Sequence, residues 1–431
     1  MLTDTIAAIA TPLGEGGLAV VRISGREALA VADRVFVPAG THGVKPSAAA
    51  SHTVNYGHVV QAGRRIDEVL LTVLRAPRTF TREDTAEISC HGGLLVTRLV
   101  LEAVLAAGAR VAEPGEFTQR AFLHGRIDLA QAEAVADLIH ARTELALSAA
   151  GEQLAGKLST RIHELRDELM RTLAHVEAHI DFPDEDISPD TRDALSGRLQ
   201  RGLAFLDGLL RTAREGQILR RGVRAAIVGR PNAGKSSLLN QLLGHERAIV
   251  SPVAGTTRDT VEETANERGI PVVFIDTAGL RDAENAVEAE GVRRSRAALE
   301  RAELLLHVLD ASEPLQPGDA RLLEEFSGRP RLLVLNKADL PRRLELPSGL
   351  PGVAVCSVTG AGIESLKDEI ERLVWSGRVS GGQFQVTVNA RHAEALRRAR
   401  VAVERAAGGL AAHESPELVA LELRIAAQAV G

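Results

Sequence analysis

The residues Gly229-Arg-Pro-Asn-Ala-Gly-Lys-Ser236 combine glycines, a lysine and a serine between an apolar run at 223–228 and a helix-prone run at 237–243. In such a pattern the glycines let backbone N–H groups turn toward phosphates, Lys235 brings a positive charge to the β and γ oxygens, and Ser236 offers a hydroxyl to Mg²⁺. The spacing therefore predicts a loop that binds a nucleoside triphosphate. A chance glycine turn is the alternative, and three motifs further along the chain argue against it.

Two of these motifs follow apolar runs: Asp276-Thr-Ala-Gly279 comes after 272–275, and Asn336-Lys-Ala-Asp339 comes after 332–335. An acidic residue at the carboxyl end of a strand can hold Mg²⁺ through water, and the amide of Gly279 can face the γ-phosphate. The carboxylate of Asp339 can accept two hydrogen bonds from guanine, whereas adenine presents an acceptor and no amine at that edge. The two motifs therefore predict that guanine is selected.

The remaining parts of the expected guanine pocket lie close to these motifs. Asn336 and Lys337 would brace the loop and flank the base, and Ser357-Val-Thr359 would supply a backbone contact to the base oxygen. In this order the motifs resemble those of the guanine-nucleotide P-loop family, with Gly255-Thr-Thr-Arg-Asp259 as the first switch. In that family the second threonine of the switch closes on Mg²⁺, which implies this role for Thr257.

One absence bears on the mechanism. Leu280 follows Gly279, where many signalling GTPases have a glutamine that orients the attacking water, so another group must orient it here. Asn232 is a second departure, because its amide oxygen could coordinate a monovalent cation. The candidates for the water-orienting group are acidic, and an exposed charged loop is the alternative interpretation of them: Asp282, Glu284, Glu288 and Glu290.

The composition limits the class of protein. The 431 residues are 45% hydrophobic and 25% charged, as in globular proteins that bury large cores. An aromatic content of 3% and a net charge of -6 disfavour a broad surface for single-stranded nucleic acid, although a small basic patch fits within that total. Cys90 and Cys356 form neither a disulfide framework nor a metal-ligand spacing, which suits a reducing compartment. With no signal segment and no apolar run of membrane-spanning length, we expect a soluble, cytoplasmic protein without a membrane partner.

The N-terminal part, 1–117, is expected to be an α+β domain, because short β-rich runs alternate with turns before a helix at 94–107. A loop is expected at 42–51. From 118 to 216 the periodicity is helical, with one apolar stripe from 154 to 180 and another from 195 to 210. The β-rich runs of the first part are at 18–23, 53–60, 66–74 and 86–90.

Between 217 and 378 apolar strands alternate with helices, which predicts an α/β domain with a mostly parallel sheet covered on both faces. The segment 379–431 is again helical. The economical arrangement is a nucleotide domain inserted into an all-α domain whose halves, 118–216 and 379–431, flank it in sequence. The expected strands are at 223–228, 272–275, 304–309, 332–335 and 353–355, and the expected helices at 289–301, 363–374, 391–407 and 416–430.

Further motifs lie along nearly the whole chain. Besides the P-loop and the switch they are Asp4-Thr-Ile-Ala-Ala, Thr11-Pro12, Gly16-Gly17, Arg22-Ile-Ser-Gly25, His91-Gly-Gly93, Pro114-Gly-Glu-Phe117, Arg120-Ala-Phe122, Asp128-Leu-Ala-Gln-Ala-Glu-Ala134 and Asp181-Phe-Pro-Asp-Glu-Asp186. Together they resemble the tRNA-modification GTPase family MnmE, also called TrmE. The resemblance implies an N-terminal domain that binds tetrahydrofolate and dimerises, a helical domain and an inserted G domain. It also implies a GTPase that is activated when G domains pair across the homodimer in a potassium-dependent way.

The family acts together with a FAD-dependent subunit, MnmG. The resemblance therefore implies a heterotetramer that installs a carboxymethylaminomethyl or aminomethyl group at C5 of the wobble uridine of certain tRNAs. The implied cofactors are GTP, Mg²⁺, K⁺ and a one-carbon donor, either 5-formyl- or 5,10-methylene-tetrahydrofolate.

The resemblance also assigns roles to single residues. Glu288 falls at the water-orienting carboxylate and would be catalytic together with Lys235. Ser236 and Thr257 fall at the Mg²⁺ site, and Arg22, Glu87 and Arg126 at folate-contacting positions, the last usually a lysine. The implied K⁺ ligands are Asn232, Ser251, Val253 and Thr256. The residues expected at GTP are Asn232, Ala233, Gly234, Lys235, Ser236, Ser237, Ser251, Pro252, Val253, Ala254, Gly255, Thr256, Thr257, Asp276, Thr277, Ala278, Gly279, Asn336, Lys337, Asp339, Ser357, Val358 and Thr359.

Two departures from the family pattern carry expectations. Arg126 in place of lysine keeps the charge and changes the geometry toward folate. The family usually closes with a segment that ends in Cys-Ile-Gly-Lys, whereas the sequence here stops at Gly431 after Leu423-Arg-Ile-Ala-Ala-Gln. We therefore expect this chain to hydrolyse GTP, bind folate and pair with its partner subunit, but to modify tRNA poorly or not at all.

Two other classes of protein would need the same GTP motifs. One is a regulatory or assembly GTPase that resets a switch on RNA or the ribosome, and the other is a mechanical GTPase that only dimerises. Neither requires a folate site, so binding of formyl-tetrahydrofolate to the N-terminal part discriminates between them and a tRNA-modifying enzyme.

Overall fold

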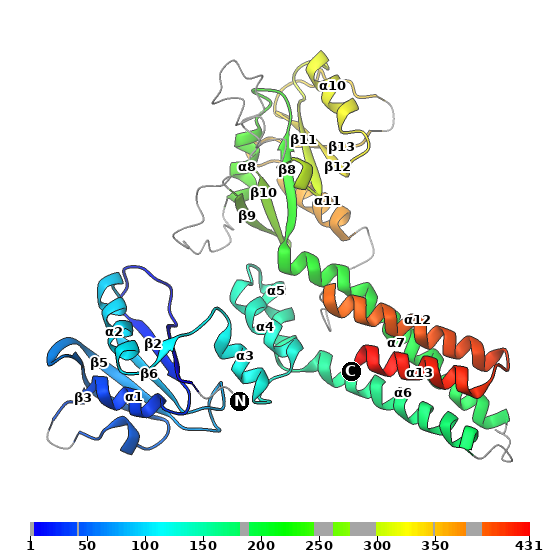
Figure 1. Cartoon of the computed structure of the whole chain (residues 1–431). Coiled ribbons are helices and arrows are strands. Elements are labelled where there is room, and N and C mark those ends of the chain that lie inside the picture. Colours follow the sequence, from blue (N-terminus) through cyan, green and yellow to red (C-terminus); the bar gives the residue numbers. More distant parts are fainter. Residues whose placement is uncertain are drawn as a thin grey trace. The chain divides into compact units, whose positions relative to one another are not determined.

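A computed structural model describes residues 4–40, 43–181, 189–244, 262–275, 299–347, 350–375 and 390–431. The chain divides into two compact units, Met1–Val135 and Ala136–Gly431 (Figure 1). Within the described ranges, no helix is both long enough and apolar enough to cross a membrane.

The first unit is built on a seven-stranded sheet with the order β3-β4-β5-β6-β2-β1-β7. Pairing is antiparallel except between β1 and β7, as expected of a sheet made largely from hairpins. The strands are β1 (Ile6–Ile9), β2 (Ala19–Ser24), β3 (Phe36–Pro38), β4 (Thr53–Gln61), β5 (Arg64–Leu74), β6 (Thr85–Cys90) and β7 (Arg110–Val111).

Helices α1 (Ala28–Val35) and α2 (Leu94–Ala106) pack on one face of this sheet. Val21, Ile23 and Leu71 point into the core between sheet and helices, so residues one step along each strand point to the other face. The segment expected as a loop contains a 3₁₀ turn, η1 (Pro46–Ala48), and α3 (Glu116–Leu123) follows β7. α4 (Leu129–His140) runs across the division between the two units.

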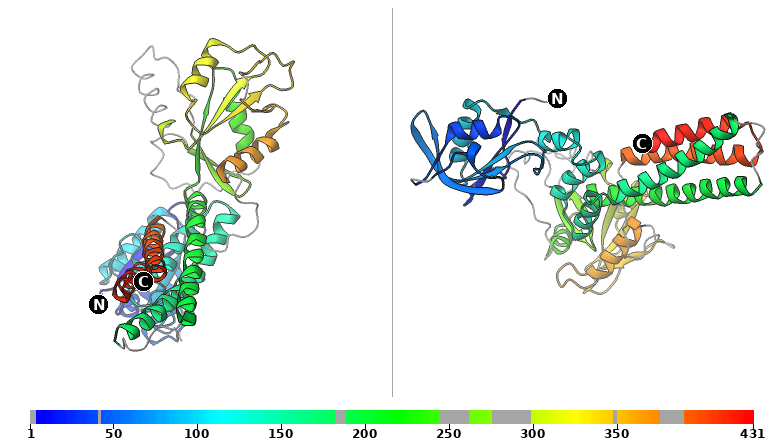
Figure 2. Two further views of the ribbon diagram at one scale, coloured as in Figure 1. Left: turned by 90° about the vertical axis from the view of Figure 1, so that its right-hand side faces the viewer. Right: turned by 90° about the horizontal axis from the view of Figure 1, so that it is seen from below.

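Long helices form one part of the second unit: α5 (Glu144–Leu154), α6 (Lys157–Asp181), α7 (Pro189–Arg221), α12 (Ala390–Ala411) and α13 (Pro416–Val430). α12 packs against α7 and α13, and α13 packs against α6 (Figure 1; Figure 2). The two predicted apolar stripes supply the contacts, because Leu165, Leu169 and Leu173 of α6 and Leu195 and Leu199 of α7 are buried. Segments from both sides of the nucleotide domain therefore build one helical bundle.

The stripe expected to run unbroken from 154 to 180 belongs to two helices. α5 ends at Leu154, α6 begins at Lys157, and Gly156 between them has a φ of +80°. That left-handed backbone ends a helix readily only at glycine, so the break is local and periodicity alone did not predict it.

The nucleotide part of this unit is a six-stranded sheet with the order β13-β12-β11-β8-β10-β9, parallel except for the β9–β10 hairpin. Its strands are β8 (Val223–Val228), β9 (Glu262–Glu267), β10 (Ile270–Ile275), β11 (Leu304–Asp310), β12 (Arg331–Asn336) and β13 (Gly352–Ala354). Its helices include α8 (Lys235–Leu243), α10 (Pro317–Glu325) and α11 (Ile363–Trp375). The predicted class, an α+β part, an all-α part and an α/β part with a mostly parallel sheet, is confirmed.

The expected boundaries at 117/118 and 216/217 fall inside α3 and α7. The predicted helix at 289–301 is described only from residue 299 onward.

Candidate nucleotide site and N-terminal ligand positions

The loop between β8 and α8 holds the predicted phosphate-binding residues. Gly229 has a φ of +148°, and a Cβ there would lie 2.3 Å from the carbonyl oxygen of Val308. A Cβ on Gly234, whose φ is +92°, would lie 2.1 Å from the Nδ2 atom of Asn336. Both positions therefore require glycine, and the loop delivers the chain to the N-terminus of α8, where unpaired amides favour an anion.

Polar side chains of this loop are available to a ligand. The ammonium of Lys235 donates to the carbonyl oxygens of Gly229 at 2.8 Å and Arg230 at 2.7 Å, so it lies over the loop. Ser236 and Ser237 are exposed in the first turn of α8. Asn232, in the loop before α8, is also exposed and has a φ of +64°. Ala233 is buried and contributes backbone only. The arrangement offers amides, one ammonium and hydroxyls to a phosphate chain.

Asn336 connects the predicted guanine-binding segment 336–339, here called the guanine loop, to the predicted phosphate-binding segment 229–236, here called the phosphate loop. Its Nδ2 donates to the carbonyl oxygen of Ala233 at 2.8 Å, and its Oδ1 accepts hydrogen bonds from the amide and the hydroxyl of Ser357 at 3.1 and 2.8 Å. Asn336 and Ser357 are buried, 2% and 5% exposed. A single side chain thus joins three segments that are far apart in sequence.

The rest of the guanine loop faces outward. Lys337 has a φ of +62° and its ammonium pairs with Asp310, the last residue of β11, at 2.6 Å. Burial raises the pKa of Asp310, but hydrogen bonds from Lys337 and Ser312 outweigh it and hold the pKa below its usual value, so this carboxylate stays charged. Asp339 is exposed, as are Val358 and Thr359. The Asp339 carboxylate is therefore accessible to the edge of a base.

Arg230 is a residue of this loop to which the sequence motifs assign no role. Its guanidinium contacts Asp319 of α10 at 2.8 Å and Glu313 at 3.0 Å, and Asp319 is only 2% exposed. The pair anchors the start of the phosphate loop to α10. Because Arg230 and Asp319 are 89 positions apart, no sequence pattern indicates that they are neighbours in space.

The switch residues lie outside the described residues, and with them part of the predicted site. These positions are Ser251, Pro252, Val253, Ala254, Gly255, Thr256 and Thr257, then Asp276, Thr277, Ala278, Gly279, Asp282, Glu284, Glu288 and Glu290.

In the first unit Arg22 of β2 and Glu87 of β6 are directly opposite each other, and their side chains form an ion pair at 2.7 Å. The guanidinium of Arg22 also lies 5.7 Å from the ring centroid of Phe117 in α3. The two side chains are 34% and 26% exposed, on the sheet face that α1 and α2 leave open. Arg126 is exposed and lines a separate pocket at one end of the sheet.

Cys90 packs as a small apolar residue. It is 1% exposed, and burial raises the pKa of its thiol, which disfavours the thiolate.

Comparison with known proteins covers both units. The family model of the GTP-binding protein TrmE N-terminus matches residues 5–126, and that of the MnmE helical domain matches residues 129–431. The tRNA modification GTPase MnmE of Geobacillus kaustophilus is 46% identical over 99% of this chain and 94% of the relative. The protein of the same name from Bacillus subtilis is 45% identical over 97% of this chain and 93% of the relative.

Among solved structures, a variant of Era from Aquifex aeolicus bound to GDP.AlF4- is 26% identical over 42% of this chain and 66% of that chain, with a TM-score of 0.27, too low to bear on the fold. The family assignment rests on the sequence matches, which cover nearly all of the chain. The chain therefore belongs to the MnmE family of tRNA modification GTPases.

Proposed function

We propose that this chain hydrolyses GTP and, with a FAD-dependent MnmG-type subunit, adds a carboxymethylaminomethyl or aminomethyl group to C5 of the wobble uridine of certain tRNAs. The observation that carries the nucleotide part is the buried side chain of Asn336, which joins the phosphate loop at Ala233 to the guanine loop and to Ser357. Family membership supports the tRNA part.

Each region has a proposed function that follows from the domains expected from the sequence. Residues 1–117 would bind tetrahydrofolate and form the homodimer, 118–216 and 379–431 would form the helical domain, and 217–378 would form the G domain. We place this activity in the cytoplasm, where its two free, buried cysteines stay reduced.

In the G domain the loop amides and Lys235 would bind the β- and γ-phosphates, and Asp339 would select guanine. The exposed hydroxyl of Ser236 and the amide oxygen of Asn232 are hard donors that suit Mg²⁺ and K⁺ respectively. These two cations supply positive charge that offsets the charge developing between the phosphates. Thr257 would complete the Mg²⁺ site, while Ser251, Val253 and Thr256 would complete the K⁺ site. Glu288 would hold the attacking water.

In the first unit the one-carbon donor would bind on the open sheet face. Arg22 and Glu87 are partly exposed there and offer a cation and a hydrogen-bond acceptor to a pteridine, and Arg126 offers a second cation. A donor set of this kind fits a heterocycle joined to carboxylates.

The test measures two activities of the full chain. GTP hydrolysis is followed by phosphate release, and wobble-uridine modification of tRNA is followed by mass spectrometry with the FAD-dependent subunit and a folate donor present. GTP hydrolysis and binding of formyl-tetrahydrofolate are expected, and any modification should depend on the folate donor. Hydrolysis without any binding of formyl-tetrahydrofolate would instead favour a regulatory or assembly GTPase.

A further inference from the structure

A basic pocket of about 700 Å³ opens at one end of the N-terminal sheet. Arg78, Arg82, Arg126 and the ring of His52 line it, and Leu74 and Phe80 give it an apolar part. Among the described residues that line it there is no carboxylate. Three arginines around one shallow, solvent-open depression favour a ligand that carries several negative charges.

The loop that carries Arg78, Phe80 and Arg82 is held in a fixed conformation. Arg82 has a φ of +58°, which a residue with a Cβ adopts only when its surroundings impose it. The hydroxyl of Thr79 donates to the carbonyl oxygen of Glu83 at 2.7 Å, and the guanidinium of Arg82 donates to the carbonyl oxygen of His124 at 3.0 Å. The imidazole of His124 in turn donates to the carbonyl oxygen of Thr81 at 2.6 Å. These contacts preorganise one wall of the pocket.

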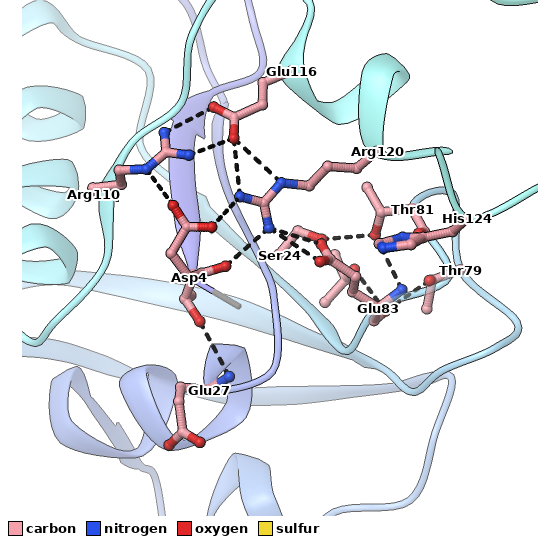
Figure 3. Close-up of polar contacts among 12 residues, drawn as sticks. Asp4, Ser24, Glu27, Thr79, Thr81, Glu83, Arg110, Glu116, Arg120 and His124 are labelled. Atoms are coloured by element: carbon pink, nitrogen blue, oxygen red, sulfur yellow. Dashed lines mark hydrogen bonds and ion pairs between the residues drawn. The ribbon is translucent and has the colours of Figure 1, made fainter. Parts of the chain in front are cut away.

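An ionic cluster around the buried side chain of Arg120 joins this loop, through Glu83, to α3 (Figure 3). Arg120 of α3 is 0% exposed and pairs with Asp4 at 2.8 Å, Glu83 at 3.0 Å and Glu116 at 2.9 Å. Glu83 belongs to the loop of Arg82, and α3 leads directly to Arg126. The cluster therefore sets the position of the loop that carries Arg78 and Arg82 relative to the end of α3.

The acidic groups of this cluster have partners within the cluster. Hydrogen bonds from Arg110 hold the pKa of Glu116 at about 2 against the opposing effect of burial, so Glu116 is ionised and already paired. Glu83 is paired with Arg120 and accepts a further hydrogen bond from Ser24 at 2.8 Å. The three pocket arginines thus keep an uncompensated positive charge among the lining residues.

The pocket adjoins the proposed folate-contacting pair. Glu87 lies opposite Thr72 of β5 and opposite Arg22 of β2. Leu74 is two residues beyond Thr72 on the same strand, so it shares the sheet face of Glu87 at a distance of about 7 Å along the strand. A ligand whose heterocycle contacts Arg22 and Glu87 can therefore extend its other end toward the arginines.

We propose that this pocket binds the oligo-γ-glutamate tail of a reduced folate and makes the chain select polyglutamylated donors. This inference rests on the proposed folate function. Each additional γ-linked glutamate brings one more carboxylate, which can accept charge-assisted hydrogen bonds from Arg78, Arg82 or Arg126. The phosphates of an RNA share the charge, but the apolar part and the shared sheet face favour the folate tail.

The experiment measures dissociation constants of the full chain for 5-formyl-tetrahydrofolate with one and with three glutamates, by titration calorimetry. The triglutamate is expected to bind at least about tenfold more tightly. Arg78→Gln should remove most of this difference and leave the affinity for the monoglutamate within about twofold, since exposed Arg78 contacts the tail alone. Arg64→Gln is the matched control, because exposed Arg64 begins β5 at the opposite end from Leu74. It should preserve the full difference.

Four outcomes separate the possible failures. Equal affinity for the two folates would overturn the tail pocket while leaving the folate function intact. A preference for the triglutamate that survives Arg78→Gln, or that Arg64→Gln removes equally, would also overturn it. No binding of either folate would overturn the folate function itself. If Arg78→Gln weakened tRNA binding and left both folate affinities unchanged, the pocket would be a phosphate site.

Discussion

The side-chain amide of Asn336 donates to the backbone carbonyl of Ala233 at 2.8 Å, and so ties the end of β12 to the loop after β8. Because the same side chain accepts two hydrogen bonds from Ser357, the phosphate-binding and base-binding segments share one buried polar group. A change at this group is therefore expected to affect both segments.

Asn336→Ala should therefore weaken GTP binding by at least about tenfold and lower the free energy of unfolding by about 1–3 kcal/mol, since it leaves buried partners unsatisfied. Fluorescent-nucleotide titration and thermal unfolding measure the two effects. Asn266→Ala is the control, because among the described residues the side chain of Asn266 accepts a hydrogen bond only from the amide of Gly269 in the β9–β10 turn. An equal loss of GTP affinity in both variants would show that Asn336 acts through general stability alone.

Asp339→Asn should lower the affinity for GTP and permit binding of xanthosine triphosphate, because the amide replaces one acceptor by a donor and xanthine presents the complementary oxygen. Competition titrations with both nucleotides measure the exchange. Asp368→Asn is the control. Asp368 is an exposed residue of α11 that pairs with Arg268, and its replacement should leave the preference for GTP over xanthosine triphosphate unchanged. Equal binding of GTP and ATP to the unaltered chain would refute the assignment of the guanine loop.

Potassium should stimulate GTP hydrolysis and sodium should do so poorly, since the smaller ion fills a site built around Asn232 less well. Asn232 is exposed in the phosphate loop with a φ of +64°. Phosphate release is compared in the two chlorides at matched ionic strength, for the native chain and for Asn232→Ala. The salt difference should disappear in the variant. Equal native rates in both salts would exclude the cation site.

Glu288→Ala should lower kcat by at least about a hundredfold and change GTP affinity little, because a group that orients water acts mainly in the transition state. Glu300→Ala is the control, as Glu300 is an exposed glutamate of the same domain. Single-turnover rates and equilibrium binding are measured separately. If affinity fell as much as the rate, Glu288 would have a structural role.

Local patterns in the sequence were enough to predict much of the fold. The strand expected at 53–60 occurs as Thr53–Gln61, and the helix expected at 416–430 occurs with those bounds. Both have uninterrupted periodicity and clear flanking residues. β9 was missed because its residues, Glu262-Glu-Thr-Ala-Asn-Glu267, are mostly polar, and it exists as an edge strand only through pairing with β10.

The candidate sites likewise include parts that local sequence patterns predict and parts that depend on tertiary packing. Motifs predicted the phosphate loop because its residues are consecutive. The cluster around Arg120 could not be predicted, since Asp4 and Glu83 are 116 and 37 positions away and meet it only after the sheet forms. The ion pair of Arg230 could not be predicted either, because its partner Asp319 lies on another element, α10. Contacts that depend on tertiary packing leave no local signal.

The buried side chain of His307 gives a prediction about the pH dependence of stability. It lies in β11 between β8 and β12, is 0% exposed, and neither ring nitrogen has a hydrogen-bond partner among the described residues. Burial, together with the charge of Arg331, lowers the pKa of His307 from 6.5 to about 4, although Asp319 opposes the shift. The imidazole is therefore neutral in the folded state.

The unfolded chain takes up this proton near pH 6.5, whereas the folded chain does so only near pH 4. The contribution of His307 to stability is accordingly complete above pH 6.5 and is lost as the pH falls to about 4. At about 1.4 kcal/mol for each pH unit, the loss amounts to about 3 kcal/mol. His307→Leu should remove this share of the pH dependence and leave stability at neutral pH nearly unchanged or raised, because no buried polar group is left unpaired.

Unfolding of the G domain can be followed selectively through Trp375, the one tryptophan of the chain, which is buried in the core of that domain. Urea unfolding of the native chain, His307→Leu and His163→Leu is compared between pH 7 and pH 4. His163 is exposed on α6, so its replacement should leave the native pH dependence in place. If the free energy of unfolding of His307→Leu fell with pH as steeply as that of the native chain, the acid sensitivity of the G domain would arise from other groups.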